Sequence, residues 1–329
     1  MLDIPVGNWA DLLITNGTAP TDLLLHFTPA SYARTGLPIR LVRAVRRFRK
    51  SNPLNRLFIL VHEAWSDELA IRPHHLARNR MARWSAGRMG QLADGVTVMT
   101  IGQQTQLTQL LGGRLVVKMG TVGANVLPSE PEQGFLSQRQ PGVWATFGMA
   151  HTRLWAMQAH KELLQSLFER GHLTSLLAIG PVDNTYADQE AAFAQQAFGP
   201  GKLVQLGALS PGDVSKHLLS VEAAVIRQDA DSLPKSGSFA SLASHGVPVI
   251  CDAPDGLVQP PHGGFFLPRE VMADPALLLN DEGVVRRRLL HDWFWSTRSW
   301  QTIGRDMHTW MAGADNQQSA ANQLVAQLY

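Results

Sequence analysis

The segment KSGSF, residues 235–239, combines residue types that can hold an anion at the start of a helix. The first turn of a helix presents backbone N–H groups without an intrahelical partner, and its partial positive charge favours phosphate. Lys235 adds a full charge, and Gly237 lets a ligand come close to the backbone. Ser236 and Ser238 add hydroxyl donors, although a serine here can also simply cap the helix. The segment therefore predicts a phosphate site, with helix capping beside a solvated lysine as the alternative.

Two arginines occupy comparable places in the same half of the chain. Arg153 begins a helix shortly after Gly148, near the end of the predicted strand 143–149, and Arg227 ends the predicted strand 222–227. A guanidinium at such a place can pair with phosphate oxygens. We expect both arginines to contribute to phosphate binding, and an ordinary surface arginine is the alternative for each.

His62 and Glu63 end a predicted strand of the first half, in the segment VHEAW. A histidine at a strand end can donate to a sugar hydroxyl or act as a base. These two residues are the candidate catalytic pair, and a satisfied, half-buried structural pair is the alternative.

The segment DAD, residues 229–231, has the spacing of two carboxylates that can hold a divalent metal. Three residues are an unspecific signal, and the predicted phosphate already has a lysine, arginines and a helix N-terminus. We therefore expect a solvated loop here, and neither a metal nor another cofactor.

The charge is uneven along the chain, whose formal net charge is +2. Residues 1–140 contain 16 Lys and Arg against 9 Asp and Glu, whereas residues 141–329 contain 13 against 18. The helix predicted at 40–50 places several of these cations opposite an apolar side. Such a helix can contact anionic lipid headgroups or attract an acidic acceptor. The alternative is the wet face of a packed helix, and we expect no nucleic acid partner.

Composition narrows the class of protein. The 329 residues, of which 45% are hydrophobic, are enough for two domains with sizeable cores. The single Cys251 excludes an intrachain disulfide and a multi-cysteine metal site, and no window resembles a membrane span of about 20 apolar residues. The first residues lack the pattern of a signal peptide. We expect a cytoplasmic protein, with peripheral association at the inner membrane face through helix 40–50 as the open option.

Strands alternate with helices in both halves, and these elements must position the residues named above. The predicted strands of the first half are 22–27, 56–63, 95–100 and 114–120, and those of the second half are 143–149, 175–180, 202–207, 222–227 and 247–252. A helix after each strand indicates mainly parallel sheets, covered by helices. The ligands of such sheets gather at the carboxyl ends of the strands.

The segment 127–142 is rich in Pro, Gly, Gln and Ser and is the predicted linker. It separates an N-terminal domain, 1–126, from a C-terminal domain, 143–305, which a closing helix at 306–329 follows. The fold class is therefore α/β, with two Rossmann-like domains that face each other across a cleft. Clefts between domains are preferred places for ligands.

The segment LGALSPGDVSKHLLSVEAAVIRQDADSLPKSGSFASLASHGVPVICD (206–252) resembles the donor domain of GT-B glycosyltransferases, in particular the retaining family four. A glycine-ended strand, a helix start, a second strand and a serine- and glycine-containing loop recur there in this order. The segments DLLLHFTPASYARTGLPIRLVRAVRRFR, LFILVHEAW and ADGVTVMT resemble the acceptor domain of the same group. The resemblance covers about residues 20 to 255.

The resemblance implies that the C-terminal domain binds a nucleotide-diphosphate sugar and that the N-terminal domain is the acceptor side. The diphosphate would lie against Lys235 to Ser238, and His62 would contact the transferred sugar. No metal would be required. The residues implied to bind the nucleotide are Gly148, Gly207, Ala208, Leu209 and Ser210.

The chain departs from the family at two positions. Many members have two glutamates eight residues apart in the donor loop, and the matching positions here are Leu233 and Ser241. The contacts to the donor sugar, and a retaining or inverting outcome, are therefore open.

The first hypothesis is sugar transfer from a nucleotide-diphosphate sugar to a hydroxyl of a glycan, protein or lipid-linked acceptor. A sugar-nucleotide epimerase is a second hypothesis, but it needs a fuller acid–base set than His62 and Glu63. A non-catalytic relative that binds a sugar nucleotide or a partner is the third, and the missing glutamates favour it.

Overall fold

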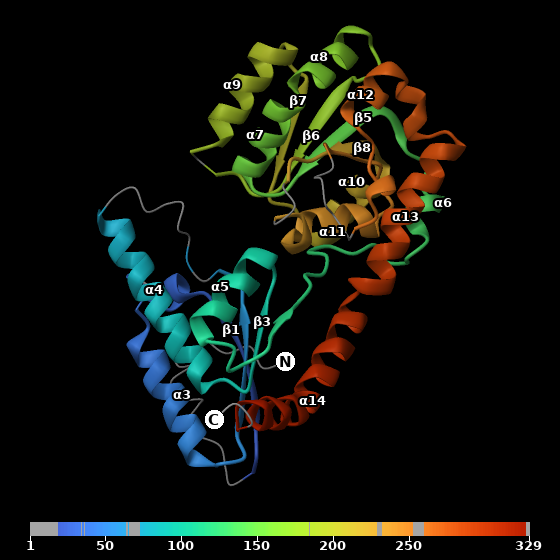
Figure 1. Ribbon diagram of the computed structural model, residues 1–329. Coiled ribbons are helices and arrows are strands. Elements are labelled where there is room, and N and C mark those ends of the chain that lie inside the picture. The colour runs from blue at the N-terminus through green and yellow to red at the C-terminus, as the bar shows by residue number, and fades with distance from the viewer. Residues whose placement is uncertain are drawn as a thin grey trace. The chain divides into compact units, whose positions relative to one another are not determined.

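The computed structural model describes residues 19–33, 35, 37–63, 65, 73–183, 185–228, 232–252 and 260–326. The chain forms two compact units (Figure 1): unit 1 is Met1–Gly120 with Arg305–Tyr329, and unit 2 is Thr121–Gly304. The segment predicted as a linker, 127–142, belongs to unit 2. It contains the short helix α6 (Gln133–Leu136) and the first residues of strand β5 (Gln140–Phe147).

Unit 1 contains a parallel sheet whose spatial order follows the chain, β1-β2-β3-β4. Its strands are β1 (Asp22–Phe27), β2 (Arg56–Val61), β3 (Gly95–Val98) and β4 (Val117–Met119). Its helices include α2 (Pro29–Tyr32), α3 (Ile39–Ser51), α4 (Pro73–Leu92) and α5 (Ile101–Leu111). The predicted alternation of strand and helix is confirmed here.

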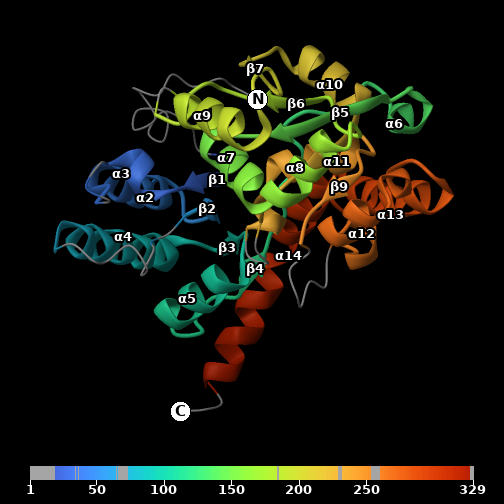
Figure 2. The same cartoon turned by 90° about the horizontal axis from the view of Figure 1, so that it is seen from above.

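Strand β2 shows how the sheet of unit 1 is covered on both faces. Successive residues of a strand point to opposite faces. Leu57 and Ile59 belong to the core that α3, α4 and α5 form with the sheet, and Figure 2 shows this unit from above. Phe58 points the other way, where Trp310 of helix α14 (Trp300–Ala326) packs edge-on against it with ring centres 5.3 Å apart. The closing helix therefore completes the second face of this sheet.

Unit 2 contains a five-stranded parallel sheet in the order β7-β6-β5-β8-β9. Besides β5, its strands are β6 (Ser175–Ile179), β7 (Leu203–Gly207), β8 (Val221–Val225) and β9 (Val249–Ile250). Its main helices are α7 (Ala150–Ala159), α8 (Lys161–Glu169), α9 (Ala187–Phe198), α10 (Pro211–Ser220), α11 (Gly237–Ser244), α12 (Pro268–Ala273) and α13 (Asp281–Thr297). After β5, the chain adds β6 and β7 on one side of this strand and then β8 and β9 on its other side. The topological switch point, where such sheets bind ligands, is therefore between β5 and β8.

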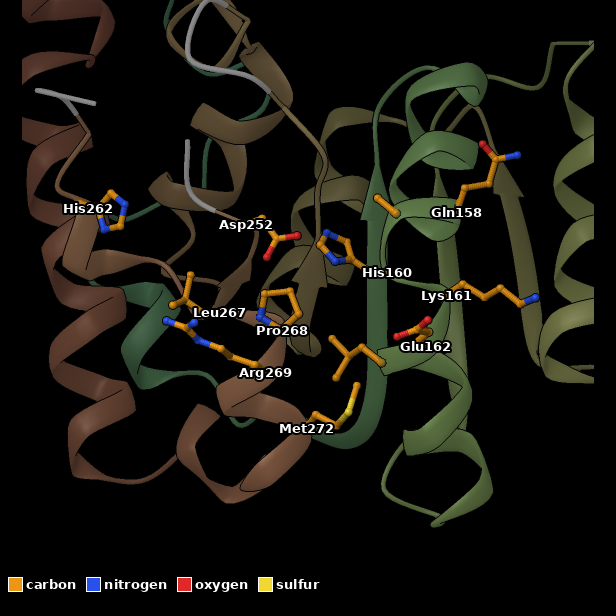
Figure 3. Close-up of a pocket in the computed structure, with 12 residues that line it drawn as sticks. Gln158, His160, Lys161, Glu162, Asp252, His262, Leu267, Pro268, Arg269 and Met272 are labelled. Atoms are coloured by element: carbon orange, nitrogen blue, oxygen red, sulfur yellow. The ribbon is translucent and has the colours of Figure 1, made fainter. Parts of the chain in front are cut away.

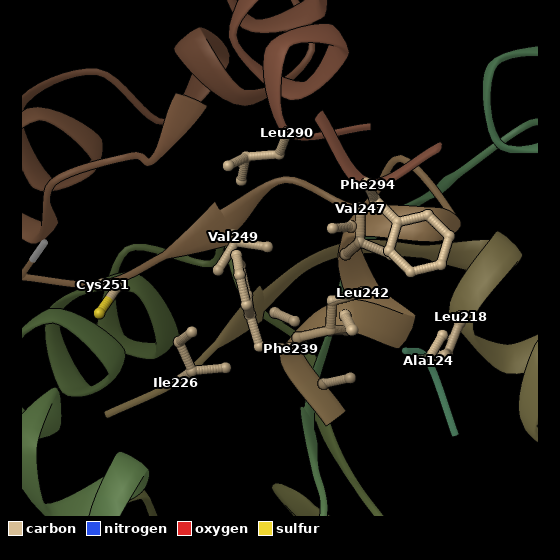
Figure 4. Packing of buried hydrophobic residues seen from close by; sticks show 14 of the residues in the cluster. Ala124, Leu218, Ile226, Phe239, Leu242, Val247, Val249, Cys251, Leu290 and Phe294 are labelled. Atoms are coloured by element: carbon tan, nitrogen blue, oxygen red, sulfur yellow. The ribbon is translucent and has the colours of Figure 1, made fainter. Parts of the chain in front are cut away.

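Two apolar clusters cover the two faces of this sheet. Trp144 of β5 packs with α7, α8 and α9, while the next residue, Ala145, packs with α10, α11 and α13. Figure 4 shows the second cluster, in which Phe239 and Phe294 lie over the strands and Cys251 is buried. Unit 2 is thus a three-layer α/β sandwich, as the sequence predicted.

The helix predicted to begin at Arg153 is two helices, α7 and α8, that meet at His160. His160 has φ −105° and ψ 22°, outside the helical range. Its imidazole Nε2 lies 2.8 Å from the carbonyl oxygen of Ile226, at the end of β8. The break therefore brings the start of α8 to the carboxyl edge of the sheet.

Candidate functional site

Glycines form the turns at the carboxyl ends of three neighbouring strands of unit 2. Gly148, Gly180 and Gly207 follow or end β5, β6 and β7, with φ values of 137°, 134° and 71°. A Cβ atom on Gly180 would lie 2.2 Å from the carbonyl oxygen of Gly148. The turns therefore touch through their backbones, and side chains are excluded from the contact.

Two helix N-termini come together at this edge. Helix α7 starts after its N-cap Met149, which follows Gly148, and α11 starts after its N-cap Ser236. A Cβ atom on Gly148 would lie 3.0 Å from the hydroxyl of Ser238, so the first turn of α11 lies against the turn before α7. Neither helix has an acidic residue in its first turn. Both partial positive charges therefore act at the switch point between β5 and β8.

Ser236 performs the capping role that the sequence left as the alternative. Its hydroxyl oxygen accepts a hydrogen bond from the backbone N–H of Phe239 at 3.1 Å, as an N-cap does. The side-chain amide of Gln228, just after β8, donates to the same oxygen at 2.7 Å. These bonds tie the start of α11 to the end of β8.

The space beside Gly237 is filled by a residue that the sequence analysis missed. We expected Gly237 to let a ligand approach, but a Cβ atom there would lie 2.2 Å from Oδ1 of Asn125. The backbone N–H of Asn125 also donates to the carbonyl oxygen of Gly237 at 3.3 Å. The glycine is thus required by a protein contact. The exposed carboxamide of Asn125 is therefore a further polar group beside the first turn of α11. No local sequence pattern predicted this contact.

Arg153, predicted as a diphosphate ligand, forms internal bonds instead. Its side chain is 1% exposed, and its Nε and Nη2 donate to the two carboxylate oxygens of Glu190, each at 2.8 Å. Its Nη1 donates to the carbonyl oxygens of Gly148 and Pro181. The prediction is corrected because the guanidinium is engaged on every nitrogen and buried, so it fixes the turns after β5 and β6.

Lys235 and Arg227 remain the candidate cations of this edge. Both side chains are exposed. In the described part of the chain, neither makes an ion pair or a side-chain hydrogen bond. Lys235 ends the short turn of 3-10 helix Leu233–Lys235 that leads into α11, and Arg227 follows β8 directly. Their role as phosphate ligands remains a prediction.

The loop predicted to hold the nucleotide base begins at Gly207 and leads into α10. The Ser210 hydroxyl caps this helix, since it accepts from the backbone N–H of Asp213 at 3.2 Å and donates to its carboxylate at 2.7 Å. Leu209 packs against the core and Ala208 is exposed. The role of Gly148, Gly207 and this loop in nucleotide binding remains a prediction.

Leu233 and Ser241, which replace the two glutamates of the resembling family, are both core residues. Leu233 is 1% exposed within the apolar cluster under α11. Ser241 is fully buried, donates to the carbonyl oxygen of Gly237 at 2.8 Å and accepts from the backbone N–H of Val126 at 3.0 Å. Neither position has room for a solvated carboxylate.

A pocket of about 740 Å³ opens beside the ends of β8 and β9 (Figure 3). The junction of α7 and α8 forms one wall, and the segment leading into α12 forms the other. Its polar lining residues are Gln158, His160, Lys161, Glu162, Asp252, His262 and Arg269. None of the residues predicted for the site lines it.

His160 is the buried polar residue of this pocket, with 3% of its surface exposed. Its Nε2 donates to the carbonyl oxygen of Ile226, so its Nδ1 is an acceptor, and that atom has no hydrogen-bond partner. Burial lowers the pKa of the imidazole, more strongly than the bond to Ile226 raises it. Figure 3 shows the ring projecting between the walls toward Asp252.

In unit 1, the predicted catalytic residue His62 lies beside a second histidine. Nε2 of His62 is 3.1 Å from Nδ1 of His26, the penultimate residue of β1. Burial lowers the pKa of His62, the neighbouring His26 lowers it further, and Glu63 opposes the shift. Glu63 is exposed beside the pair. His26 was missed by the sequence analysis, because only the parallel pairing of β1 with β2 brings the two rings together.

The basic helix predicted at 40–50 is α3, and it packs against the sheet. Leu41, Val45 and Phe48 are buried in the core of unit 1. Its exposed cations are Arg40, Arg43, Arg46, Arg47 and Lys50. No helix that the structure describes is long and apolar enough to cross a membrane. The DAD segment, 229–231, lies outside the described residues.

No protein-family model matches this chain, and no curated protein matches it in sequence. Solved structures do match. Sucrose-phosphate synthase from Thermosynechococcus elongatus has a TM-score of 0.57 at 13% identity, with 92% of this chain and 81% of that chain covered. Anabaena HepE in complex with UDP-glucose has a TM-score of 0.60 at 15% identity, with 88% and 78% covered.

A third similar structure is the α,α-trehalose-phosphate synthase (UDP-forming) from Burkholderia xenovorans. Its TM-score is 0.60 at 10% identity, with 93% of this chain and 75% of that chain covered. These structures are GT-B glycosyltransferases with two Rossmann-like domains. This chain therefore has the GT-B fold, which confirms the predicted fold class.

Proposed function

We propose that this protein is a glycosyltransferase that moves a sugar from a nucleotide-diphosphate sugar to a hydroxyl acceptor and needs no metal. The observation that carries the proposal is the meeting of two helix N-termini at the switch point of unit 2, beside the exposed Lys235 and Arg227. The HepE structure contains UDP-glucose, and the trehalose-phosphate synthase is UDP-forming, which supports a nucleotide sugar as donor. Unit 2 is then the donor side and unit 1 the acceptor side.

The chemistry proposed for this edge is stabilisation of the leaving diphosphate. Negative charge builds on the diphosphate oxygens as the bond to the sugar breaks. Fixed N–H dipoles and cations stabilise that charge without having to reorganise. The start of α11, with Ser238 and Lys235, and the start of α7 supply these groups. Charge from the protein itself supports the proposal that no metal is needed.

The donor sugar is proposed to bind in the pocket beside β8 and β9. Sugar hydroxyls donate to carboxylates, and Leu233 and Ser241 place no carboxylate at the two positions where the resembling family has glutamates. Asp252 and Glu162 are carboxylates in the pocket. We assign the nucleoside to the other side of the switch point, at Gly148 and the loop Gly207 to Ser210.

His62 and Glu63 are the proposed catalytic residues. They follow β2 directly, at the carboxyl edge of the sheet of unit 1. Their side chains are exposed, and an imidazole with a lowered pKa is neutral near pH 7, which suits a base.

The helical face of unit 1 supports an acidic or membrane-linked acceptor. Helices α3 and α4 lie next to each other and contain no Asp or Glu. Besides its arginines, α4 exposes Trp84 and Leu76. Cations with interspersed apolar side chains favour an anionic lipid surface. We propose peripheral contact with the inner membrane face here.

The diphosphate assignment is tested with Lys235→Ala. A lost charge-assisted bond to phosphate is worth about 1.5–3 kcal/mol, so we expect the Kd of the best-binding nucleoside diphosphate to rise about tenfold or more. The Kd of the matching nucleoside should stay the same. Lys202→Ala is the control, because Lys202 precedes β7 at the opposite edge of the sheet. Equal losses for both ligands, measured by calorimetry, would remove Lys235 from the phosphate site.

The reaction class is tested by incubating the protein with sugar nucleotides and candidate acceptors. Release of nucleoside diphosphate that depends on an acceptor, and persists in EDTA, is expected. Binding without release on any acceptor would favour the non-catalytic relative. Conversion of one sugar nucleotide into another, without release, would favour the epimerase.

The membrane contact is tested by sedimentation with lipid vesicles. We expect the protein to pellet with vesicles that contain phosphatidylglycerol and to stay in solution with purely zwitterionic ones. Replacing Arg43 and Arg47 by Gln should weaken binding, at about 1 kcal/mol per charge, and so should raised salt. The matched control replaces Arg269 and Lys202 of unit 2. Binding that does not depend on lipid charge would contradict the assignment, and so would equal losses of vesicle binding in the two double variants.

A further inference from the structure

Two histidines end neighbouring strands of unit 1, and their rings face each other. His26 belongs to β1 and His62 follows β2. Nδ1 of His26 and Nε2 of His62 are 3.1 Å apart, and the ring centres are 5.3 Å apart with an angle of 30° between the planes. This separation is that of a hydrogen bond between the two nitrogens.

The backbone of each histidine is fixed by a side chain from another element. The amide of Gln103, on α5, donates to the carbonyl oxygen of His62 at 2.7 Å. The hydroxyl of Tyr32, on α2, donates to the carbonyl oxygen of His26 at 2.6 Å. The parallel pairing of β1 with β2 sets how far apart the two histidines lie along the strands, since His26 is in register with Leu60. The facing rings are therefore a product of the fold.

Two nitrogens at this distance can hold only one hydrogen between them. Two N–H groups would collide, and two lone pairs would repel each other. The tautomers of the neutral rings are therefore linked. When His62 donates through Nε2, its Nδ1 is a free lone pair. When His26 donates through Nδ1, the Nδ1 of His62 carries a hydrogen.

We propose that His26 and His62 share one proton and act as a dyad, in which His26 is the positioning residue that sets the charge and tautomer of His62. This role rests on the proposed function. As the acceptor oxygen bonds to the sugar carbon, the sugar–oxygen bond to the diphosphate breaks and its electron pair leaves with the diphosphate. The acceptor proton enters Nδ1 of His62, the bridging proton moves to His26, and the proton on Nε2 of His26 goes to solvent.

The charged groups around His62 act in opposite directions. Among the described residues these groups are His26, from β1, and Glu63, in the same segment as His62. Gln103 and Tyr32, from α5 and α2, are neutral. A positive charge on one ring opposes a charge on the other, so the dyad takes up its first proton more readily than its second.

The test follows the titration of each imidazole by NMR in the full chain with labelled histidine. We expect His26→Ala to raise the pKa of His62, because repulsion from the neighbouring His26 lowers that pKa in the wild type. His26→Asn keeps a single hydrogen bond near the place of Nδ1 but cannot pass on a proton. His172→Ala is the control, since His172 is exposed in unit 2. A titration curve of His62 that is the same in wild type and His26→Ala would overturn the dyad.

Kinetics separate positioning from mere structure. We expect His26→Ala and His26→Asn to lower kcat about tenfold with the donor KM unchanged, and the acidic limb of the kcat profile to move to higher pH in His26→Ala. Wild-type kcat in His26→Asn would overturn proton passage through His26. Circular dichroism should match wild type for both variants, because Tyr32 holds a backbone oxygen that they retain. The titration does not depend on turnover, so a failure of the glycosyltransferase assignment would be seen separately.

Discussion

The carboxyl ends of the parallel strands carry glycines in unit 2 and imidazoles in unit 1. In unit 2, Gly148, Gly180 and Gly207 pack backbone against backbone, and what they leave available is helix N-termini. In unit 1, His26 and His62 meet at the ends of β1 and β2. Within each sheet the strands are parallel, and helices connect them. The difference teaches that one architecture can present peptide dipoles, which suit a fixed anion, or titratable side chains, which suit proton transfer.

The same difference appears in how the cations of unit 2 are used. Arg153 lies at the edge but is wholly engaged with Glu190 and two carbonyl oxygens, whereas Lys235 is exposed. A buried ion pair adds little net stability, because both charges lose their hydration. Removing one partner is destabilising, because the other charge is then buried without compensation. Arg153 is therefore part of the scaffold that holds the glycine turns.

The largest effect is expected from replacing Arg153, and it tests whether this residue is part of the scaffold. Arg153→Met should lower the free energy of unfolding by about 3–5 kcal/mol, because Glu190 is then left buried with only the amide of Gln205 as a side-chain partner. Urea unfolding measures this. The double variant Arg153→Met, Glu190→Leu should recover most of the loss. A single variant with wild-type stability and lost nucleotide binding would restore Arg153 to the phosphate site.

A smaller effect sharpens the role of the glycine turns. Gly180→Ala should cost about 3 kcal/mol, since its Cβ would meet the Gly148 oxygen at 2.2 Å and its φ of 134° strains any side chain. Gly171→Ala is the control: it also has positive φ, 72°, but nothing lies within 4 Å of its Cβ position. That variant should cost about 1–2 kcal/mol. Equal losses in thermal unfolding would show that backbone strain alone, without the contact between turns, sets the cost.

Much of the scaffold could be predicted from local pattern. Buried strands such as β2 and β5 are short apolar runs, and each is followed by a helix, so parallel sheets with ligands at the carboxyl edges followed directly. Lys235 and Ser236 could be located at a helix start for the same reason. Even so, the pattern could not tell capping from ligand binding at Ser236, because both use the same hydroxyl.

Sequence alone determined the strand–helix alternation, the two α/β units and the edges where chemistry is expected, because hydrophobic periodicity and turn residues act over a few neighbouring positions. Tertiary structure alone decided the partners. Glu190 reaches Arg153 from 37 residues away, Asn125 fills the space at Gly237, and the ring of His26 comes to face His62 only when β1 pairs with β2. Such contacts depend on strand order and register, which no local pattern encodes, and they decide which polar groups are engaged within the protein and which remain available to a ligand.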